Sequence, residues 1–123
     1  MVGLKRIYDG VRKEDGCRIL VDGLWPRGQS KEKAAVDLWE KETAPTQELR
    51  EWFGHRPERF DEFRERYLAE LRGNPAAGLF AEMVRKQLSR GAVTFVYAAR
   101  DPVHNHAMVL KQYVEERLKE GKI

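Results

Sequence analysis

The chain has 123 residues, of which 41% are hydrophobic and 35% are charged. These values are typical of one soluble globular domain over residues 1–123 and exclude a low-complexity chain. The net charge of +3 comes from 23 basic and 20 acidic residues. Because both signs are interleaved along the chain, no basic block indicates a nucleic-acid-binding surface.

Three further features narrow the setting of the protein. No apolar run approaches the ~20 residues that a membrane-spanning helix needs, and the N-terminus lacks the apolar segment of a signal peptide. Cys17 is the only cysteine, so the chain cannot form an internal disulfide, and we expect a small buried thiol rather than a nucleophile. The sequence therefore predicts a cytoplasmic protein without a membrane segment.

Two short strands are predicted near the N-terminus, at residues 4–10 and 17–25. Each apolar run is broken by an Asp-Gly pair, which is typical of a turn. The turn at residues 11–16 is too short for a helix. An antiparallel hairpin is therefore favoured over a parallel crossover.

Residues 34–45 are ambiguous. Before them, Ser30 in the expected loop at residues 26–33 can cap one helical turn. The alanines that follow favour a helix, whereas Val36 and Leu38 alternate with polar neighbours as in a strand. We expect a short helix that becomes extended by Ala44, because a residue before proline avoids helical geometry.

Three helices are predicted between Thr46 and Ser89. Thr46 is expected to cap the first, which ends at Gly54. Pro57 opens the second, and Asn74 caps the third. The second helix has apolar residues at the 3.6-residue helical period, and these are Phe60, Phe63, Tyr67, Leu68 and Leu71. The expected buried face of the third comprises Leu79, Phe80, Met83, Val84 and Leu88.

Residues 92–99 form the most apolar stretch and predict a central strand with both faces covered by helices. A last helix is expected from about His104 to Glu120. Its inward side chains are Ala107, Leu110, Val114 and Leu118. The predicted fold class is α/β, a single domain with a small sheet of about three to four strands, partly parallel and covered by helices.

Polar side chains follow two of the predicted strands. In α/β sheets, ligands bind beyond the carboxyl ends of parallel strands, close to helix N-termini. If the strands within residues 17–25 and 92–99 are parallel neighbours, the loops after them share one edge of the sheet. The candidate residues in these loops are Asp22, Trp25, Arg27, Arg100, Asp101, His104 and Asn105.

Arg27 and Arg100 are the candidate anion ligands, because a guanidinium can bind phosphate or carboxylate through two hydrogen bonds. The alternative for Arg27 is structural, with its guanidinium bonded to loop carbonyls or to Asp22. Trp25 could stack on a planar ligand or belong to the core. Asp22 and Asn105 complete the predicted ligand-binding set.

His104, oriented by Asp101, is the candidate acid or base, because imidazole titrates near neutral pH. The alternative is a helix N-terminal residue that only bonds to Asp101. His106 is expected to face solvent, and His55 to cap helix carbonyls. No third firm ligand accompanies a site built on Asp101, His104 and His106, so neither a metal nor a cofactor is predicted.

Five segments are similar to the YeaO-like family, also known as domain of unknown function 488. In chain order they are RILVDGLWPRG, SKEKAAVDLW, ELREWFGH, RFDEFRERYLAEL and VYAARDPVHN. The resemblance covers about residues 4 to 118 and implies a small cytoplasmic α/β protein without implying a reaction. The matching motif residues are Asp22, Trp25, Pro26, Arg27, Gly28, Lys31, Trp39, Arg100, Asp101, His104 and Asn105.

One position departs from the family pattern. Relatives commonly have arginine where this chain has Gly23. If that arginine helps to hold an anion, Arg18 or Arg12 would have to replace it here.

Three hypotheses for function follow from these observations. The leading one is a domain that binds a small anionic, phosphorylated or nucleotide-like molecule, with enzyme status left open. The first alternative is a nucleic-acid-binding accessory protein whose positive ends fold onto one face. The second is an interaction protein whose polar cluster is structural, with Arg27 and Arg100 saturated by internal partners. The sequence indicates neither a partner protein nor an oligomeric state.

Overall fold

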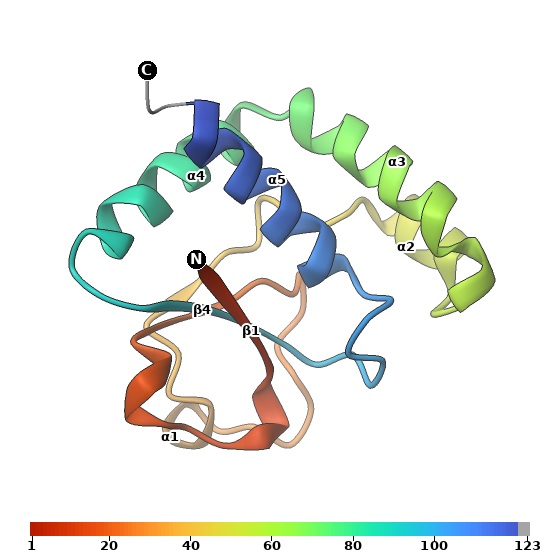
Figure 1. The fold of residues 1–123 in the computed structure, drawn as a ribbon. Coiled ribbons are helices and arrows are strands. Elements are labelled where there is room, and N and C mark those ends of the chain that lie inside the picture. Colours follow the sequence, from red (N-terminus) through yellow and green to blue (C-terminus); the bar gives the residue numbers. More distant parts are fainter. Residues whose placement is uncertain (121–123) are drawn as a thin grey trace.

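The computed structural model describes residues 1–120 of the chain and contains one four-stranded sheet (Figure 1). The strands are β1 (Val2–Arg6), β2 (Cys17–Leu20), β3 (Leu38–Trp39) and β4 (Val93–Tyr97). Their order is β1-β4-β2-β3, and all three pairings are parallel. The fold is therefore the predicted α/β domain, and the carboxyl ends of all four strands point to the same edge of the sheet.

The expected hairpin between the first two strands is wrong, because β4 lies between them. Val93 pairs with Val2 on one side and with Cys17 on the other. The connection from β1 to β2 contains two 3₁₀ turns, Ile7–Asp9 and Lys13–Asp15. All five residues of β4 are buried, and a strand this apolar is most stable with a neighbour on each edge.

A buried polar network holds this connection in place. The Asp15 carboxylate accepts hydrogen bonds from Lys5 Nζ and lies 2.6 Å from Arg18 Nη1. Burial by itself would raise the pKa of Asp15, but these bonds and one from a backbone amide lower it overall. Arg18 also donates to the carbonyls of Ala34 and Ala35. Its guanidinium is thus used inside the fold.

The short helix α1 (Lys31–Ala34) is capped by Ser30, whose hydroxyl accepts from the Lys33 amide at 3.0 Å, as predicted. The expected continuation of this helix is wrong. Ala35 has a left-handed φ of 46° that ends the helix. The chain then enters β3, which pairs with Ile19 and Leu20 of β2.

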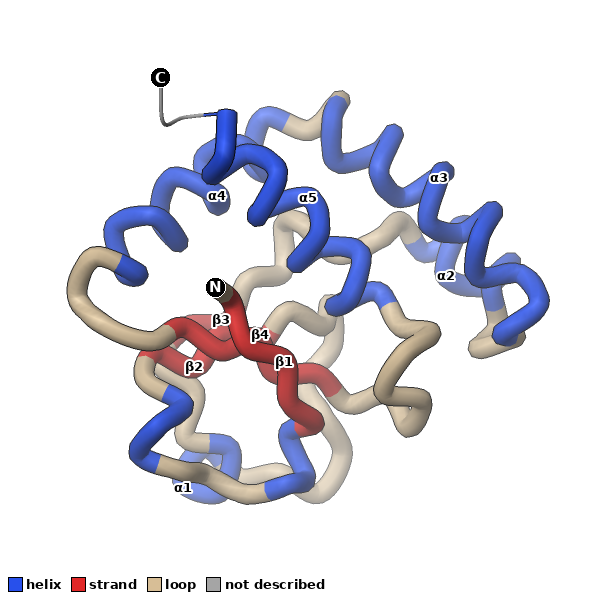
Figure 2. Tube along the Cα trace, in the orientation of Figure 1, coloured by secondary structure: helices blue, strands red, loops and turns tan. Residues whose placement is uncertain are grey.

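The longer helices occupy the predicted regions and cover one face of the sheet (Figure 2). They are α2 (Gln47–Phe53), α3 (Phe60–Arg72) after a 3₁₀ turn at Pro57–Arg59, α4 (Pro75–Leu88) and α5 (His106–Glu120). The predicted caps are present: Thr46 accepts from the Leu49 amide and Asn74 from the Ala76 amide. Gly54 ends α2 in a left-handed conformation.

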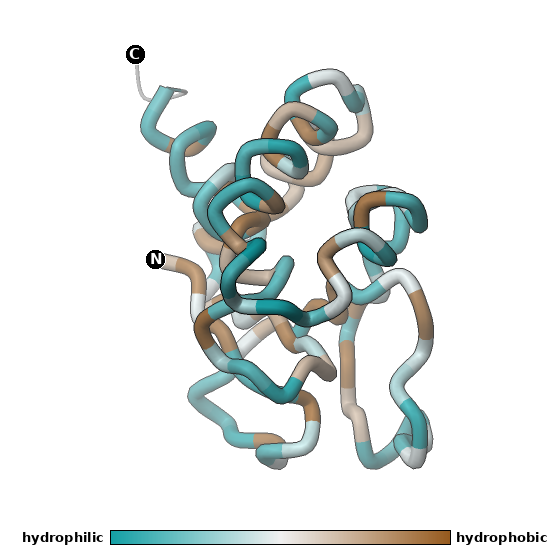
Figure 3. The backbone as a smooth tube through the Cα atoms, turned by 90° about the vertical axis from the view of Figure 1, so that its right-hand side faces the viewer, coloured by the Kyte–Doolittle hydropathy of each residue, from teal (hydrophilic) through white to brown (hydrophobic). Residues whose placement is uncertain are grey.

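The predicted apolar stripes of α3 and α5 are buried throughout. The predicted buried face of α4 is wrong at Leu79, which is 73% exposed, whereas Ala77 and Ala81 are buried. Two positions along a helix correspond to a rotation of about 200°, so Leu79 lies on the side opposite Ala77. Figure 3 shows hydrophilic and hydrophobic segments alternating along the helices, as expected of amphipathic elements.

The other face of the sheet is covered by α1, turns and loops rather than by long helices (Figure 2). A second apolar cluster lies there, with Ile7, Leu20, Ala34 and Val96 at its centre and Trp25, Val36, Trp39 and Ala98 around them. Within residues 1–120, no helix is long and apolar enough to cross a membrane.

Candidate functional site

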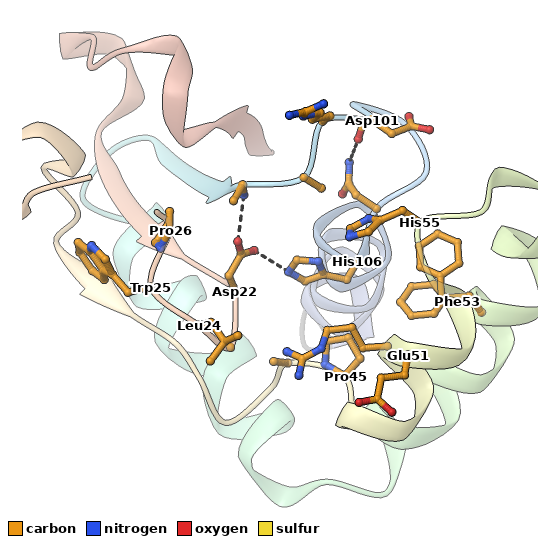
Figure 4. Close-up of a pocket in the computed structure, with 18 residues that line it drawn as sticks. Asp22, Leu24, Trp25, Pro26, Pro45, Glu51, Phe53, His55, Asp101 and His106 are labelled. Atoms are coloured by element: carbon orange, nitrogen blue, oxygen red, sulfur yellow. Dashed lines mark hydrogen bonds and ion pairs between the residues drawn. The ribbon is translucent and has the colours of Figure 1, made fainter. Parts of the chain in front are cut away.

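A cavity of about 810 Å³ lies beyond the carboxyl ends of β2 and β4 (Figure 4). Its walls come from residues 22–26 after β2, residues 98–101 after β4, residues 44–55 around α2, and the start of α5. This volume falls within the range of small-molecule sites, roughly 300–1,000 Å³. The parallel pairing of β2 with β4 therefore brings the two predicted loops to one hollow.

Asp22 connects three segments of the cavity wall (Figure 4). Its Oδ2 accepts from the Ala98 amide at 3.0 Å, and its Oδ1 lies 2.9 Å from His106 Nε2. His106 Nε2 also hydrogen-bonds to the Val21 carbonyl at 3.2 Å, whereas Asp22 Oδ1 has no hydrogen-bond partner within residues 1–120, so its contact with Nε2 is an ion-pair distance only. Since both neighbours of Nε2 are acceptors, Nε2 carries the proton.

The expectation that His106 faces solvent is wrong. Its side chain is only 18% exposed and lines the cavity. Helix α5 begins at His106 rather than at His104. This start places the imidazole of His106 beside Asp22. Asn105 could have signalled this boundary, because asparagine is among the strongest N-cap residues.

His104 and Asp101 form the predicted pair, but His104 is not part of the cavity wall. Its Nδ1 lies 2.9 Å from Asp101 Oδ2, and its ring stands edge-on to Phe60 at 5.2 Å. The other oxygen of Asp101 accepts from the amides of Val103 and His104. The two amides and the imidazole lower the pKa of Asp101 to about 2. This carboxylate therefore orders the loop at the cavity rim.

Asn105 is 2% exposed and uses its amide inside the fold. Its Nδ2 donates to the Asp101 carbonyl at 2.8 Å, and its Oδ1 accepts from the Met108 amide at 2.9 Å. The second bond is an N-cap of α5. Asn105 borders the cavity, and its side chain holds the helix start against the loop.

Trp25 borders the cavity but turns its ring away from it (Figure 4). Its Nε1 donates to the Gln29 carbonyl at 2.6 Å, and its ring packs edge-on against Trp39 at 5.3 Å. The ring belongs to the second apolar cluster. This placement matches the core interpretation of Trp25.

The two predicted arginines are placed differently. Arg100 is exposed and lines the cavity, and its side chain has no ion-pair or hydrogen-bond partner within residues 1–120. Arg27 is also exposed but does not line the cavity. The Arg27 carbonyl accepts from the Tyr8 hydroxyl at 3.0 Å. The structure thus brings only Arg100 to the hollow.

Arg50 of α2 is a cavity residue that the sequence did not reveal. Its side chain is exposed and, in the described part of the chain, has no hydrogen-bond or ion-pair partner. A Cβ atom built on Gly23 would lie 3.6 Å from Arg50 Nη1. Arg50 therefore occupies the space that a longer side chain at position 23 would enter. Arg18 is engaged elsewhere, and Arg12 is not in the cavity wall.

His55 also lines the cavity, and its expected role as a helix cap is wrong. The Gly54 amide bonds to the Arg50 carbonyl and closes the helix instead. His55 follows in a left-handed conformation with φ of 57°. Such backbone is costly for a residue other than glycine and is often found beside binding sites. Over residues 1–120, no group of three or more His, Cys, Asp or Glu side chains could hold a metal ion.

Comparison with known proteins places the chain in a family. A family model described as "Inactive DUF488-N3 subclade" matches residues 1–122. The uncharacterised protein Rv3073c of Mycobacterium tuberculosis is 45% identical over 116 residues, which cover 94% of this chain and 95% of that protein. The uncharacterised protein YeaO of Escherichia coli is 42% identical over 111 residues, or 89% of this chain and 93% of YeaO. No solved structure matches the chain.

The family match spans the whole described chain, and the two relatives align over nearly their full lengths. Six of the motif residues that suggested the resemblance line the cavity, namely Asp22, Trp25, Pro26, Arg100, Asp101 and Asn105. The chain therefore belongs to the YeaO-like DUF488 family, in the branch described as its inactive DUF488-N3 subclade.

Proposed function

We propose that this protein binds a small organic anion in the cavity between β2, β4, α2 and α5, with Arg50 and Arg100 as the charged ligands. The observation that carries the proposal is the pair of exposed guanidiniums on a hollow of about 810 Å³. Neither side chain has an internal partner in residues 1–120, so each keeps its donors for a ligand.

Binding fits the site better than catalysis does. His104, the predicted acid or base, lies outside the cavity wall and packs on Phe60. The name of the subclade includes the word inactive, which agrees with a site that holds a ligand without converting it. His55 would add a donor to the anion site without supplying a reaction step, whereas the Nε2 proton of His106 is directed at Val21 and Asp22.

The structural-cluster hypothesis accounts for part of the predicted set. Asp22, Asn105 and Trp25 are all engaged by internal partners. That hypothesis also requires Arg100 to be saturated, and Arg100 has no such partner in the described residues. In this proposal the engaged residues stabilise the cavity wall, and Arg50 and Arg100 contact the ligand.

Calorimetric titration of inorganic phosphate, methyl phosphate and phosphorylated metabolites would test the proposal. We expect Arg50→Ala and Arg100→Ala each to weaken binding by about tenfold or more, because each removes a charge-assisted hydrogen bond worth about 1.5–3 kcal/mol. Arg27→Ala is the matched control, since it removes an exposed arginine near the same edge but outside the cavity wall. Equal binding by all four proteins would contradict the proposal. A loss of binding confined to Arg27→Ala would place the anion site at the loop that carries Arg27 instead.

A further inference from the structure

We propose that the anion bound in this cavity carries an apolar body with few hydrogen-bond donors, such as an aryl or short-chain carboxylate or phosphate ester, and is not a nucleotide. This inference rests on the proposed function. It follows from which polar groups of the cavity wall are already engaged and from the side chains that form the remaining wall.

Most acceptor atoms on the side chains of the cavity wall already receive hydrogen bonds. These side chains are Asp22, Glu51, Asp101 and Asn105. Asp22 Oδ1 receives none from the described residues, but it is shielded from solvent and lies 2.9 Å from His106 Nε2. A ligand that donates hydrogen bonds would therefore find few side-chain acceptors.

The backbone carbonyls at the exit of β4 are engaged as well. Arg6 reaches across from β1, and its Nε donates to the Ala99 carbonyl at 2.8 Å while its Nη2 donates to that of Ala98 at 3.2 Å. The Asp22 carbonyl accepts from Trp39 Nε1 at 2.7 Å. These three carbonyls are therefore less available to hydrogen-bond donors of a ligand.

The polar groups that remain favour a ligand rich in acceptors. The side chains of Arg50 and Arg100 have only donors. The ring of His55 can also donate to an anion. A carboxylate or phosphate group would accept hydrogen bonds from these donors.

The rest of the wall is apolar. It is formed by Leu24, Pro26, Pro45, Phe53, Phe63, Ala98 and Ala99. A nucleobase placed against these side chains would bury N–H groups without acceptors, which is costly. A phenyl or alkyl group has no such groups and gains from leaving water.

The test compares ligands of matched charge by calorimetric titration of the full chain. We expect phenyl phosphate to bind about tenfold tighter than methyl phosphate, since it buries an aromatic ring against the apolar wall. We also expect it to bind tighter than adenosine monophosphate. Phenylacetate compared with acetate shows whether a carboxylate can replace the phosphate group. Adenosine monophosphate binding as tightly as phenyl phosphate, or tighter, would overturn the inference.

A wall variant makes the test independent of the arginines. Leu24 is 69% exposed and lines the cavity, so Leu24→Ser should leave the fold intact. We expect this substitution to weaken the binding of phenyl phosphate about threefold and to leave the binding of methyl phosphate unchanged. Val11→Ser is the control, because Val11 is 50% exposed and lies outside the cavity wall.

The outcomes separate the two proposals. If methyl phosphate binds through Arg50 and Arg100 while the phenyl group adds nothing, the apolar-body inference fails and the proposed function stands. If no anion binds, the proposed function itself fails. A Leu24→Ser effect of the same size on both phosphates would also contradict an apolar contact.

Discussion

At the scale of single residues, two histidines that are close in the sequence have different surroundings. His104 and His106 are two positions apart, yet only His106 lines the cavity, while His104 packs on Phe60. Two aspartates that are far apart in the sequence also differ, since Asp22 contacts His106 in the cavity wall, whereas Asp101 orders its own loop. Residue type therefore indicates what a side chain can do, and its neighbours decide what it does here.

The lowered pKa of Asp101 predicts a pH effect on stability. Its pKa of about 2 lies below the usual 3.8, so the ionised form stabilises the fold above about pH 4. This contribution is lost as the pH falls toward 2. In urea unfolding followed by circular dichroism, we expect the difference in unfolding free energy between the wild type and Asp101→Asn to shrink over that range.

The control for this prediction is Asp61→Asn on α3. The Asp61 side chain is 97% exposed and lies 3.8 Å from Arg64, and such exposed pairs contribute little. Its substitution should leave the acid limb of the stability curve unchanged. A difference for Asp101→Asn that stays constant from pH 7 to pH 2 would refute the assigned role of this carboxylate.

At the scale of elements, the start of α5 decides the shape of the cavity. The helix N-terminus is held by Asn105, which also bonds to the Asp101 carbonyl. The same turn presents His106 to Asp22. The position of the first helical residue therefore sets which histidine enters the hollow.

Removing this cap should lower stability more than removing a half-exposed one. We expect Asn105→Ala to cost about 2 kcal/mol, because it loses an N-cap and leaves buried polar groups without partners. Asn74→Ala on α4 is the matched comparison and should cost about 1 kcal/mol. Thermal unfolding measures both. A weakening of anion binding by Asn105→Ala with unchanged stability would instead support the predicted ligand-binding role of Asn105.

At the scale of the whole molecule, the charge pattern does not favour a nucleic-acid-binding surface. Two arginines on the helices lie close to acids of the same helix, Arg66 to Glu62 and Arg85 to Glu82. Interleaved charges release few counterions from a phosphate backbone. The net charge of +3 is therefore a small excess over interleaved charges of both signs.

This distribution predicts weak binding to nucleic acids. Titrated with duplex and single-stranded DNA in fluorescence anisotropy at physiological salt, the protein should bind with a Kd above about 0.1 mM. Phenyl phosphate in the same buffer serves as the reference ligand. Tighter binding that falls steeply with added salt would favour the nucleic-acid alternative.

Local features of this protein were predictable from the sequence because their causes lie within a few residues. Ser30, Thr46 and Asn74 cap helices as predicted, since a cap bonds to amides two or three positions away. The stripe of α3 is buried because helical geometry aligns its apolar residues. The apolar run at β4 likewise predicted a central strand, which placed the two polar loops at one edge once the pairing was parallel.

Only the tertiary structure decided which distant segments became neighbours. The insertion of β4 between β1 and β2 replaced the hairpin, and the pairing of β3 with β2 overrode a local preference for helix. Arg50 reached the cavity through the docking of α2, which no spacing in the chain encodes. Strand pairing and helix docking depend on burial and hydrogen bonding summed over the whole fold, so short sequence patterns leave them undetermined.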